Sequence, residues 1–206
     1  DLHLSIRRQR QMCIRDSSPV YTIWKKFSHG LGPVNGDFGK ISLSLLGLNL
    51  FYKAMSSDKY ILQEVVDART EREFLDLPRK IYKGNRNWVC PLDPSIQAVF
   101  DPKKNEMFSD GEAIRWIARD KKGEVVGRIA AFYDREHAFL EEQPTGGCGF
   151  FEAINDQELA DQLFDAARMW LSSRGMEAMD GPINFGPRDS WWGLLVSGYE
   201  FQPLYE

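Results

Sequence analysis

The sequence is poor in the residue types that build metal centres and disulfide frameworks. Its 206 residues include three cysteines and three histidines, and no two cysteines have C-x-x-C spacing. Zinc sites and disulfide-rich small domains need clusters of these residues, so the sequence predicts neither, and we expect no bound metal. Two isolated cysteines in the main part of the chain and no clear signal sequence fit a reducing cytoplasm.

The chain also lacks long apolar runs and an excess of positive charge. No apolar run reaches the roughly 18 residues of a membrane-spanning helix. Lys and Arg number 26 against 30 Asp and Glu, a net charge of −4, which argues against a dedicated nucleic-acid binder. The 43% hydrophobic and 13% aromatic content is enough for one globular domain with a sizeable core. We therefore expect neither a nucleic-acid partner nor a membrane partner.

The first 17 residues resemble translated sequencing-adapter DNA. Residues 7–17 read RRQRQMCIRDS, the peptide that a transposase-type adapter encodes in this frame, and residues 1–3 fit the flow-cell part of the same DNA. The other interpretation is a basic arm or a targeting peptide. We expect residues 1–17 to be an artefact and disordered, which also removes the Arg-rich segment as evidence for nucleic-acid or membrane binding.

Residues 18–54 are a doubtful leader. They are rich in Gly, Ser and Leu without helix or strand periodicity. Met55 then begins a segment that looks like the ordinary start of a protein. We expect this segment to be read-through or a leader with poor order; a genuine N-terminal extension is the alternative. The remaining domain, residues 55–206, holds 18 basic and 27 acidic side chains, so it is clearly acidic.

Strand and helix patterns alternate along residues 55–206. β-Rich runs predict strands at 60–66, 113–120, 125–133, 147–154 and 176–183, and apolar stripes predict helices from Thr70, at 93–100 and at 155–174. Thr70 with Glu73, and Asn155 with Glu158, have capping-box spacing, and Asp93-Pro94 predicts another helix start. Pro78 predicts a kink or a short helix. A hairpin followed by a strand–helix–strand crossover predicts an α/β (α+β) fold with a mixed, mostly antiparallel sheet flanked by helices.

This order resembles the front of the GNAT superfamily of acyl-CoA-dependent N-acyltransferases. Four segments resemble an uncharacterised bacterial group within it: FLDLPRKIYKGNRNWVCPLD (74–93), GEAIRWIARDKKGEVVGRIAAFYD (111–134), GFFEAINDQELADQLFDAARMWLSSRGMEAMDGPIN (149–184) and WGLLVSGY (192–199). Members of that group run past this length, so the resemblance implies that the domain at 55–206 is incomplete at its C-terminus. A missing half-sheet would leave an open edge, so we expect aggregation or a homodimer.

The resemblance also implies where acetyl-CoA or another acyl-CoA would bind as co-substrate. In the superfamily the strand before the long helix contacts the pantetheine arm, and the pyrophosphate lies at the helix N-terminus. Carried over, the cofactor-binding residues are Phe151, Glu152, Ala153, Ile154, Asn155, Asp156 and Gln157. The turn departs from the family pattern, because it has no glycine and carries two acids, Asp156 and Glu158. Helix capping is the alternative reading of these acids.

Few residues are candidates for chemistry. Glu152 lies where several superfamily members carry a general base, although it could equally face solvent. Asn184, Arg188 and Trp191 follow a strand end and are candidate substrate residues; a Gly-Pro turn or core packing are the alternatives. We expect Arg115 and Arg128 to pair with acids, His137 to be exposed in a polar segment and Cys148 to be structural.

The resemblance implies an N-acyltransferase in which a small-molecule or peptide amine attacks the acyl thioester directly. The protein would supply positioning and a base. The alternative is a non-catalytic GNAT-like scaffold or acyl-CoA-binding module of a longer protein, which the glycine-free turn favours.

Overall fold

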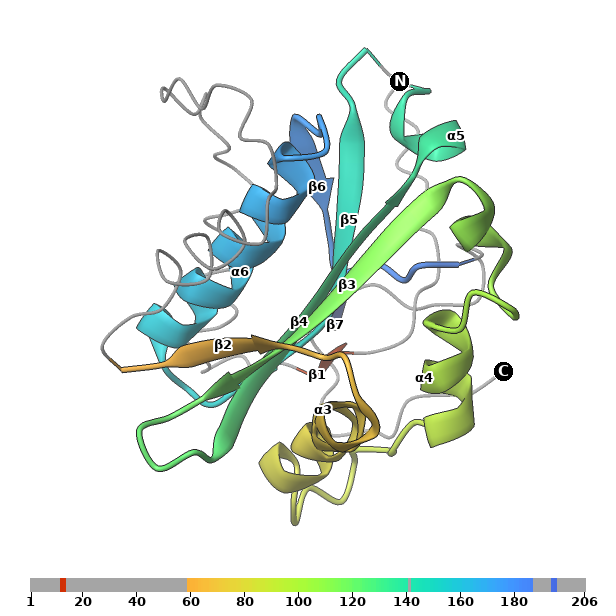
Figure 1. Ribbon diagram of the computed structural model, residues 1–206. Coiled ribbons are helices and arrows are strands. Elements are labelled where there is room, and N and C mark those ends of the chain that lie inside the picture. The colour runs from red at the N-terminus through yellow and green to blue at the C-terminus, as the bar shows by residue number, and fades with distance from the viewer. Residues whose placement is uncertain (1–11, 14–58, 141, 187–193, 196–206) are drawn as a thin grey trace.

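A mixed five-stranded sheet organises the chain (Figure 1). The computed structural model describes residues 12–13, 59–140, 142–186 and 194–195. The strands are β2 (Ile61–Glu64), β3 (Gly111–Arg119), β4 (Val125–Asp134), β5 (Thr145–Ala153) and β6 (Ala178–Asp180), in that spatial order. Only β5 and β6 run parallel; the other neighbours are antiparallel. The predicted fold class, an α+β fold with a mixed, mostly antiparallel sheet, is therefore confirmed.

Helices cover both faces of this sheet. Helix α6 (Gln157–Ser172) packs on one face, and α3 (Ala68–Ile81) and α4 (Asp93–Val99) pack on the other (Figure 1). Successive side chains of a strand point to opposite faces of the sheet, which explains this division. On β3, Trp116 belongs to the core under α6, and its neighbour Ile117 belongs to the core under α3. No helix in the described ranges combines the length and apolar character needed to cross a membrane.

The helix starts differ by a few residues from those predicted. Helix α3 is capped by Asp67, whose carboxylate accepts from the Thr70 backbone N–H at 2.7 Å, so Thr70 is the third helical residue and not the cap. Helix α6 is capped by Asp156 and not by Asn155, and Leu92, not Asp93, precedes α4. At α3 and α6 several neighbouring side chains could have capped the helix and the backbone path selected one, whereas α4 has no side-chain cap. Helix α3 continues past Pro78 to Ile81.

The predicted hairpin is present and its strands are longer than expected. Its turn is closed by Asp120, whose side chain accepts from the backbone N–H groups of Lys122 and Glu124 at 2.9 Å each. Gly123 has φ +83°, a backbone conformation that glycine adopts without strain. The segment after β4, predicted as a polar connection, begins with the short helix α5 (Arg135–Ala138), and the 3₁₀ turn η1 (Glu106–Ser109) precedes β3.

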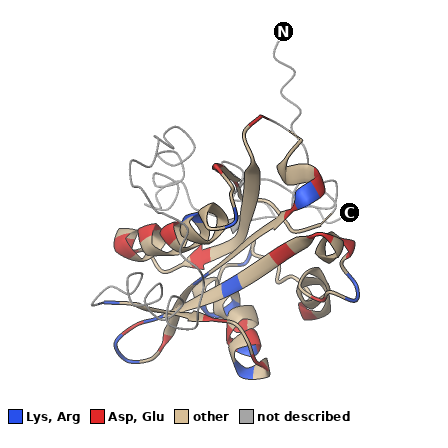
Figure 2. Cartoon of the chain, turned by 45° about the horizontal axis from the view of Figure 1, so that its top comes forward, with Lys and Arg blue, Asp and Glu red and all other residues tan. Residues whose placement is uncertain are grey.

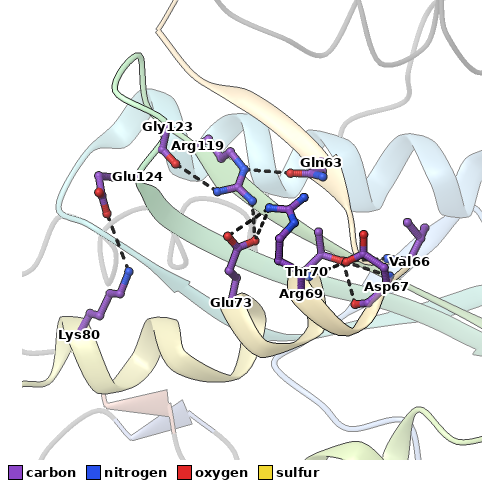
Figure 3. A network of polar contacts seen from close by, with 10 residues as sticks. All are labelled: Gln63, Val66, Asp67, Arg69, Thr70, Glu73, Lys80, Arg119, Gly123 and Glu124. Carbon is purple, nitrogen blue, oxygen red and sulfur yellow. Dashed lines mark hydrogen bonds and ion pairs between the residues drawn. The ribbon is translucent and has the colours of Figure 1, made fainter.

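Arg119 at the end of β3 ties the hairpin to two other elements (Figure 3). Its guanidinium donates to Gln63 on β2 at 2.9 Å, to Glu73 on α3 at 2.5 Å and to the Gly123 carbonyl at 3.1 Å. The contact between Arg119 and Glu73 holds α3 against the sheet at the end of β3. Charged side chains otherwise mark the helix surfaces, including acidic positions along α6, and the strands are mostly uncharged (Figure 2).

Residues 12–13 form a separate small ladder. Strand β1 (Met12–Cys13) pairs in parallel with β7 (Leu194–Leu195). The remainder of 1–58 lies outside the described residues, so the boundaries proposed at residues 17 and 54 stay predictions.

Candidate functional site

A pocket of about 540 Å³ lies where the ends of several elements meet. It is bounded by the end of β4, by α5, by the start of β5, by the end of β6 and by the segment 183–186 that follows β6. Its wall combines apolar side chains with polar ones: Met107, Phe132, Leu140, Ile183 and Phe185 on the one hand, and Asp134, His137, Thr145, Asp180 and Asn184 on the other. Pockets of roughly 300–1,000 Å³ with a few polar groups are typical of small-molecule sites.

Glycine at the start of β5 shapes one wall of this pocket. A Cβ added at Gly147 would lie 2.5 Å from the Phe132 ring and 2.6 Å from the end of the Ile183 side chain. The missing side chain therefore lets Phe132 and Ile183 close over the strand. Gly147 pairs with Asp180 on β6, so the same register brings Asp180 to the pocket.

Asp134 and His137 form a side-chain pair at the pocket. Asp134 caps α5: its Oδ1 accepts from the His137 backbone N–H at 2.9 Å and lies 2.5 Å from the ring Nδ1. An ionised carboxylate can only accept a hydrogen bond, so in the neutral imidazole this contact places the ring proton on Nδ1 and makes Nε2 the acceptor. The His137 side chain is 41% exposed, so the ring is accessible from solvent.

Asn184 contributes an unsatisfied acceptor to the same wall. Its Oδ1 atom is buried and has no hydrogen-bond partner among the described residues. A buried carbonyl without a donor costs free energy. Asn184, predicted as a substrate residue, lies at the pocket, and its role stays a prediction; Arg188 and Trp191 lie outside the described residues.

Glu152, the predicted general base, lies elsewhere. Its side chain is 8% exposed and accepts from Arg128 Nε at 2.5 Å. Arg128 in turn donates to the Phe74 carbonyl at 2.6 Å, and its guanidinium lies 4.6 Å from the centre of the Phe74 ring. The structure therefore holds Glu152 in a buried ion pair under α3, outside the set of pocket residues. The pairing expected for Arg128 is present, although inside the protein; Arg115 pairs with Glu71 at 3.4 Å.

The second half of β5 contains a bulge. Arg128 pairs with Glu152 and Ala130 with Gly149, so β5 has one more residue than β4 in this interval, and Phe150 has φ +53°. The two consecutive aromatic rings at the bulge lie on opposite faces of the sheet. Phe151 stacks on Phe164 of α6 at 4.5 Å between ring centres, and Phe150 lies 5.0 Å from Phe100. The Phe151 side chain, predicted to contact acyl-CoA, is thus part of the core.

The turn between β5 and α6 is occupied by its own carboxylate. Asp156 accepts from the Leu159 backbone N–H at 3.2 Å and pairs with Lys59. The Lys59 ammonium, followed by the hydrogen bond from Leu159, holds the pKa of Asp156 below its ordinary value. The capping interpretation of Asp156 is confirmed. Ile154, Asn155 and Gln157 are exposed around it, and their predicted contact with a cofactor stays a prediction.

Cys148 and His137 are placed as the sequence predicted. Burial raises the pKa of the Cys148 thiol to about 12, which fits a structural residue. His137 is exposed, but sequence reasoning missed its pairing with Asp134 and its place at the pocket. The available signal was an Asp three residues before the one histidine of residues 55–206, directly after a predicted strand.

Two curated bacterial proteins are similar to the chain in sequence. It is 30% identical over 158 residues to the "Bacterial ceramide synthase" of Caulobacter vibrioides, covering 74% of this chain and 39% of that protein. It is 28% identical over 153 residues to "Protein YghO" of Escherichia coli (strain K12), covering 72% of this chain and 37% of that protein. The chain thus spans about two fifths of the length of these relatives. No protein-family model matches it.

Solved structures resemble it more distantly. A tandem GNAT protein from the clavulanic acid biosynthesis pathway has a TM-score of 0.42 at 16% identity, covering 56% of this chain and 33% of that one. An acetyltransferase from Clostridium acetobutylicum with acetyl-CoA has a TM-score of 0.45 at 11% identity, covering 61% and 81%.

Proposed function

We propose that this protein is an acyl-CoA-dependent N-acyltransferase whose acceptor is an amine with a long hydrocarbon chain. The observation that carries the proposal is the pocket, whose wall joins apolar side chains to the acids Asp134 and Asp180 and to His137. Apolar walls suit a hydrocarbon chain, and carboxylates suit an ammonium group. The relative named as a ceramide synthase supports the same class, because a ceramide is an amide of a long-chain amino alcohol.

The reaction is a direct transfer. The neutral amine nitrogen attacks the thioester carbonyl carbon, a C–N bond forms, and the C–S bond breaks to release the CoA thiolate. The ammonium form of the amine loses one proton before attack and a second as the amide forms; the thiolate takes up one of them and the other leaves to solvent. The protein orients the two substrates and accepts a proton.

Acyl-CoA is expected along the second half of β5 and the turn that follows it, at Phe151–Gln157. Asp156 already accepts the Leu159 backbone N–H at the start of α6, where a pyrophosphate would otherwise bind. We therefore propose that the phosphates of the donor lie away from this helix end. The role predicted for Glu152 as a base would require release of Glu152 from Arg128.

Mass spectrometry of the reaction products tests the proposal. The full-length protein is incubated with a long-chain 2-amino-1,3-diol and either acetyl-CoA or a long-chain acyl-CoA, and the amide and free CoA are quantified. The matched control is the corresponding diol without the amino group. We expect equal amounts of amide and CoA from the amine and neither from the control. A folded protein that releases no amide from any long-chain amine overturns the proposal.

The second candidate is a non-catalytic acyl-CoA-binding or scaffold module. Two observations favour it: Asp156 occupies the helix start, and Glu152 is held by Arg128. Calorimetric titration separates the two functions. Saturable acyl-CoA binding without amide formation would support the module, and amide formation would exclude it.

A further inference from the structure

We propose that His137 is the general base that takes the proton from the acceptor amine, and that Asp134 is its positioning residue. The inference rests on the proposed function and names the group in the pocket that performs its proton transfer. It also replaces Glu152, the base expected from the sequence, with a residue from a different element.

One carboxylate oxygen positions the imidazole through two hydrogen bonds. Asp134 Oδ1 accepts both the His137 backbone N–H at 2.9 Å and the ring Nδ1 at 2.5 Å. The same carboxylate therefore fixes the start of α5 and the orientation of the ring. Only 15% of the Asp134 side chain is exposed, so water competes little for it. A histidine oriented in this way presents Nε2 as an acceptor, which is what a general base needs.

Accessibility distinguishes His137 from Glu152. A base must come within hydrogen-bond distance of the proton that it removes. His137 lines the pocket and is 41% exposed, and Asp134 engages only its Nδ1. Glu152 is 8% exposed, is bound by Arg128 and is not a pocket residue. Proton transfer to Glu152 would first require a buried ion pair to open.

Two further pocket groups can hold the amine beside His137. Asp180 adds a carboxylate that can attract an ammonium group, and Asn184 Oδ1 is a buried acceptor without a described partner. Because Asn184 Oδ1 is closed to solvent, a hydrogen bond from the amine N–H to this atom requires the Asn184 side chain to turn toward the pocket. Leu140, 70% exposed and part of the same wall, offers an apolar surface to the hydrocarbon chain.

The proton balance then involves named atoms. The ammonium gives one proton to His137 Nε2, and the neutral nitrogen attacks the thioester carbonyl carbon. The C–S bond breaks as the amide forms, and the nitrogen gives its second proton to the departing thiolate, which leaves as CoA–SH. His137 releases its proton to water, so that one acyl-CoA and one ammonium yield one amide, one CoA thiol and one proton.

Chemical rescue tests this assignment. Amide formation and acyl-CoA affinity are measured for wild type, His137→Ala, His137→Gln and Asp134→Asn, with Glu136→Gln on the same helix as the matched control. Glu136 is exposed and is not a pocket residue. We expect kcat to fall roughly a hundredfold to ten-thousandfold in both His137 variants, with unchanged acyl-CoA affinity and thermal midpoint. Added imidazole restores His137→Ala and not Asp134→Asn, while Glu136→Gln keeps wild-type kinetics.

The outcomes separate this inference from the proposed function. An active wild type with His137 variants within about threefold of it overturns the role of His137 and leaves the transferase intact. A fall in kcat that imidazole does not restore, accompanied by a lower thermal midpoint, also overturns it, because the histidine would then be structural. A wild type that forms no amide with any long-chain amine overturns both.

Discussion

Arg128 and Glu152 form the most deeply buried of the ion pairs among the described residues, with side-chain exposures of 3% and 8%. Each charge has lost its water, and the pair is held further by the Phe74 carbonyl. Removing one partner of such a pair leaves the other charged and unpaired in the interior. At this position the structural role of Glu152 is therefore large, whatever it contributes to chemistry.

Glu152→Gln is expected to lower the free energy of unfolding by roughly 3 kcal/mol, because the Arg128 charge loses its counterion. Urea denaturation at neutral pH measures the change. The matched control is Glu158→Gln on the exposed start of α6, which should change the stability by less than about 0.5 kcal/mol. Equal, small effects of both substitutions would contradict the burial argument.

Cys148 is expected to resist thiol reagents while the protein is folded. Burial raises the pKa of its thiol to about 12, so almost no thiolate is present at neutral pH, and the side chain is inaccessible. In a Cys13→Ser background, Cys90, which is exposed, should react first, and Cys148 only on unfolding. Labelling followed by peptide mass spectrometry checks the order; equal rates in the folded protein would refute it.

At the scale of elements, β5 is the strand on which the fold depends most. It pairs antiparallel with β4 and parallel with β6, it contains the bulge at Phe150, and its glycines allow close approach of the segment after β6. The Ile183 backbone N–H donates to the Cys148 carbonyl at 3.0 Å, which continues the contact beyond the β6 ladder.

Gly149→Ala is expected to disrupt this contact. The added Cβ would lie 2.0 Å from the Ile183 carbonyl oxygen, a backbone atom that cannot turn aside. The variant should therefore unfold at clearly lower urea than wild type and lose pocket-dependent activity. Gly123→Asn is the control, because nothing lies within 4 Å there and Asn tolerates the positive φ. Wild-type stability of Gly149→Ala would show that the segment after β6 moves freely.

Asp156→Asn is expected to destabilise the start of α6 in a pH-dependent way. The pKa of Asp156 is lowered by Lys59 and by the Leu159 N–H, so its carboxylate stabilises the folded state. A lowered folded pKa gives a contribution that is complete above the unfolded value of about 3.9 and is lost as the pH falls through the folded value. The difference from wild type, measured by urea denaturation, should be present at pH 7 and shrink below about pH 4. Asn155→Ala, which removes no charge, should show no such dependence.

On the scale of the whole molecule, Phe185 joins parts of the chain that are far apart in sequence. Its ring lies 4.9 Å from Phe108 in η1 and 5.3 Å from Phe132 on β4, and its carbonyl accepts from the Asn105 side chain at 2.8 Å. Only 2% of the residue is exposed. These contacts hold the segment 183–186, with Asn184, at the pocket.

Phe185→Ala is expected to cost roughly 3–5 kcal/mol of stability, because it leaves a cavity beside the Phe108 and Phe132 rings. The same change should raise the KM for the amine acceptor, since the pocket loses one wall. Denaturation and steady-state kinetics measure the two effects. Phe139→Ala, which removes a 54% exposed ring beside the pocket helix, is the control and should preserve stability. Equal stability of both variants would contradict the packing role of Phe185.

The sequence by itself determined the elements whose signals are local. The β-rich runs around Asp120–Glu124 specified the hairpin, and the apolar stripe from Leu159 to Leu171 specified α6 and its buried face, because periodicity and turn chemistry act over a few residues. The order of these elements was enough to predict a mixed, mostly antiparallel sheet.

Only the tertiary structure decided which side chains meet. The partner of Glu152 depends on the β4–β5 register, which the bulge at Phe150 sets, and no local pattern encodes that register. The pocket is assembled from η1, β4, α5, β5, β6 and the segment after β6, so its histidine, acids and Asn184 come together only when the sheet forms. Burial and register act between distant residues, and these long-range contacts gave Glu152 a structural partner and placed His137 at the pocket.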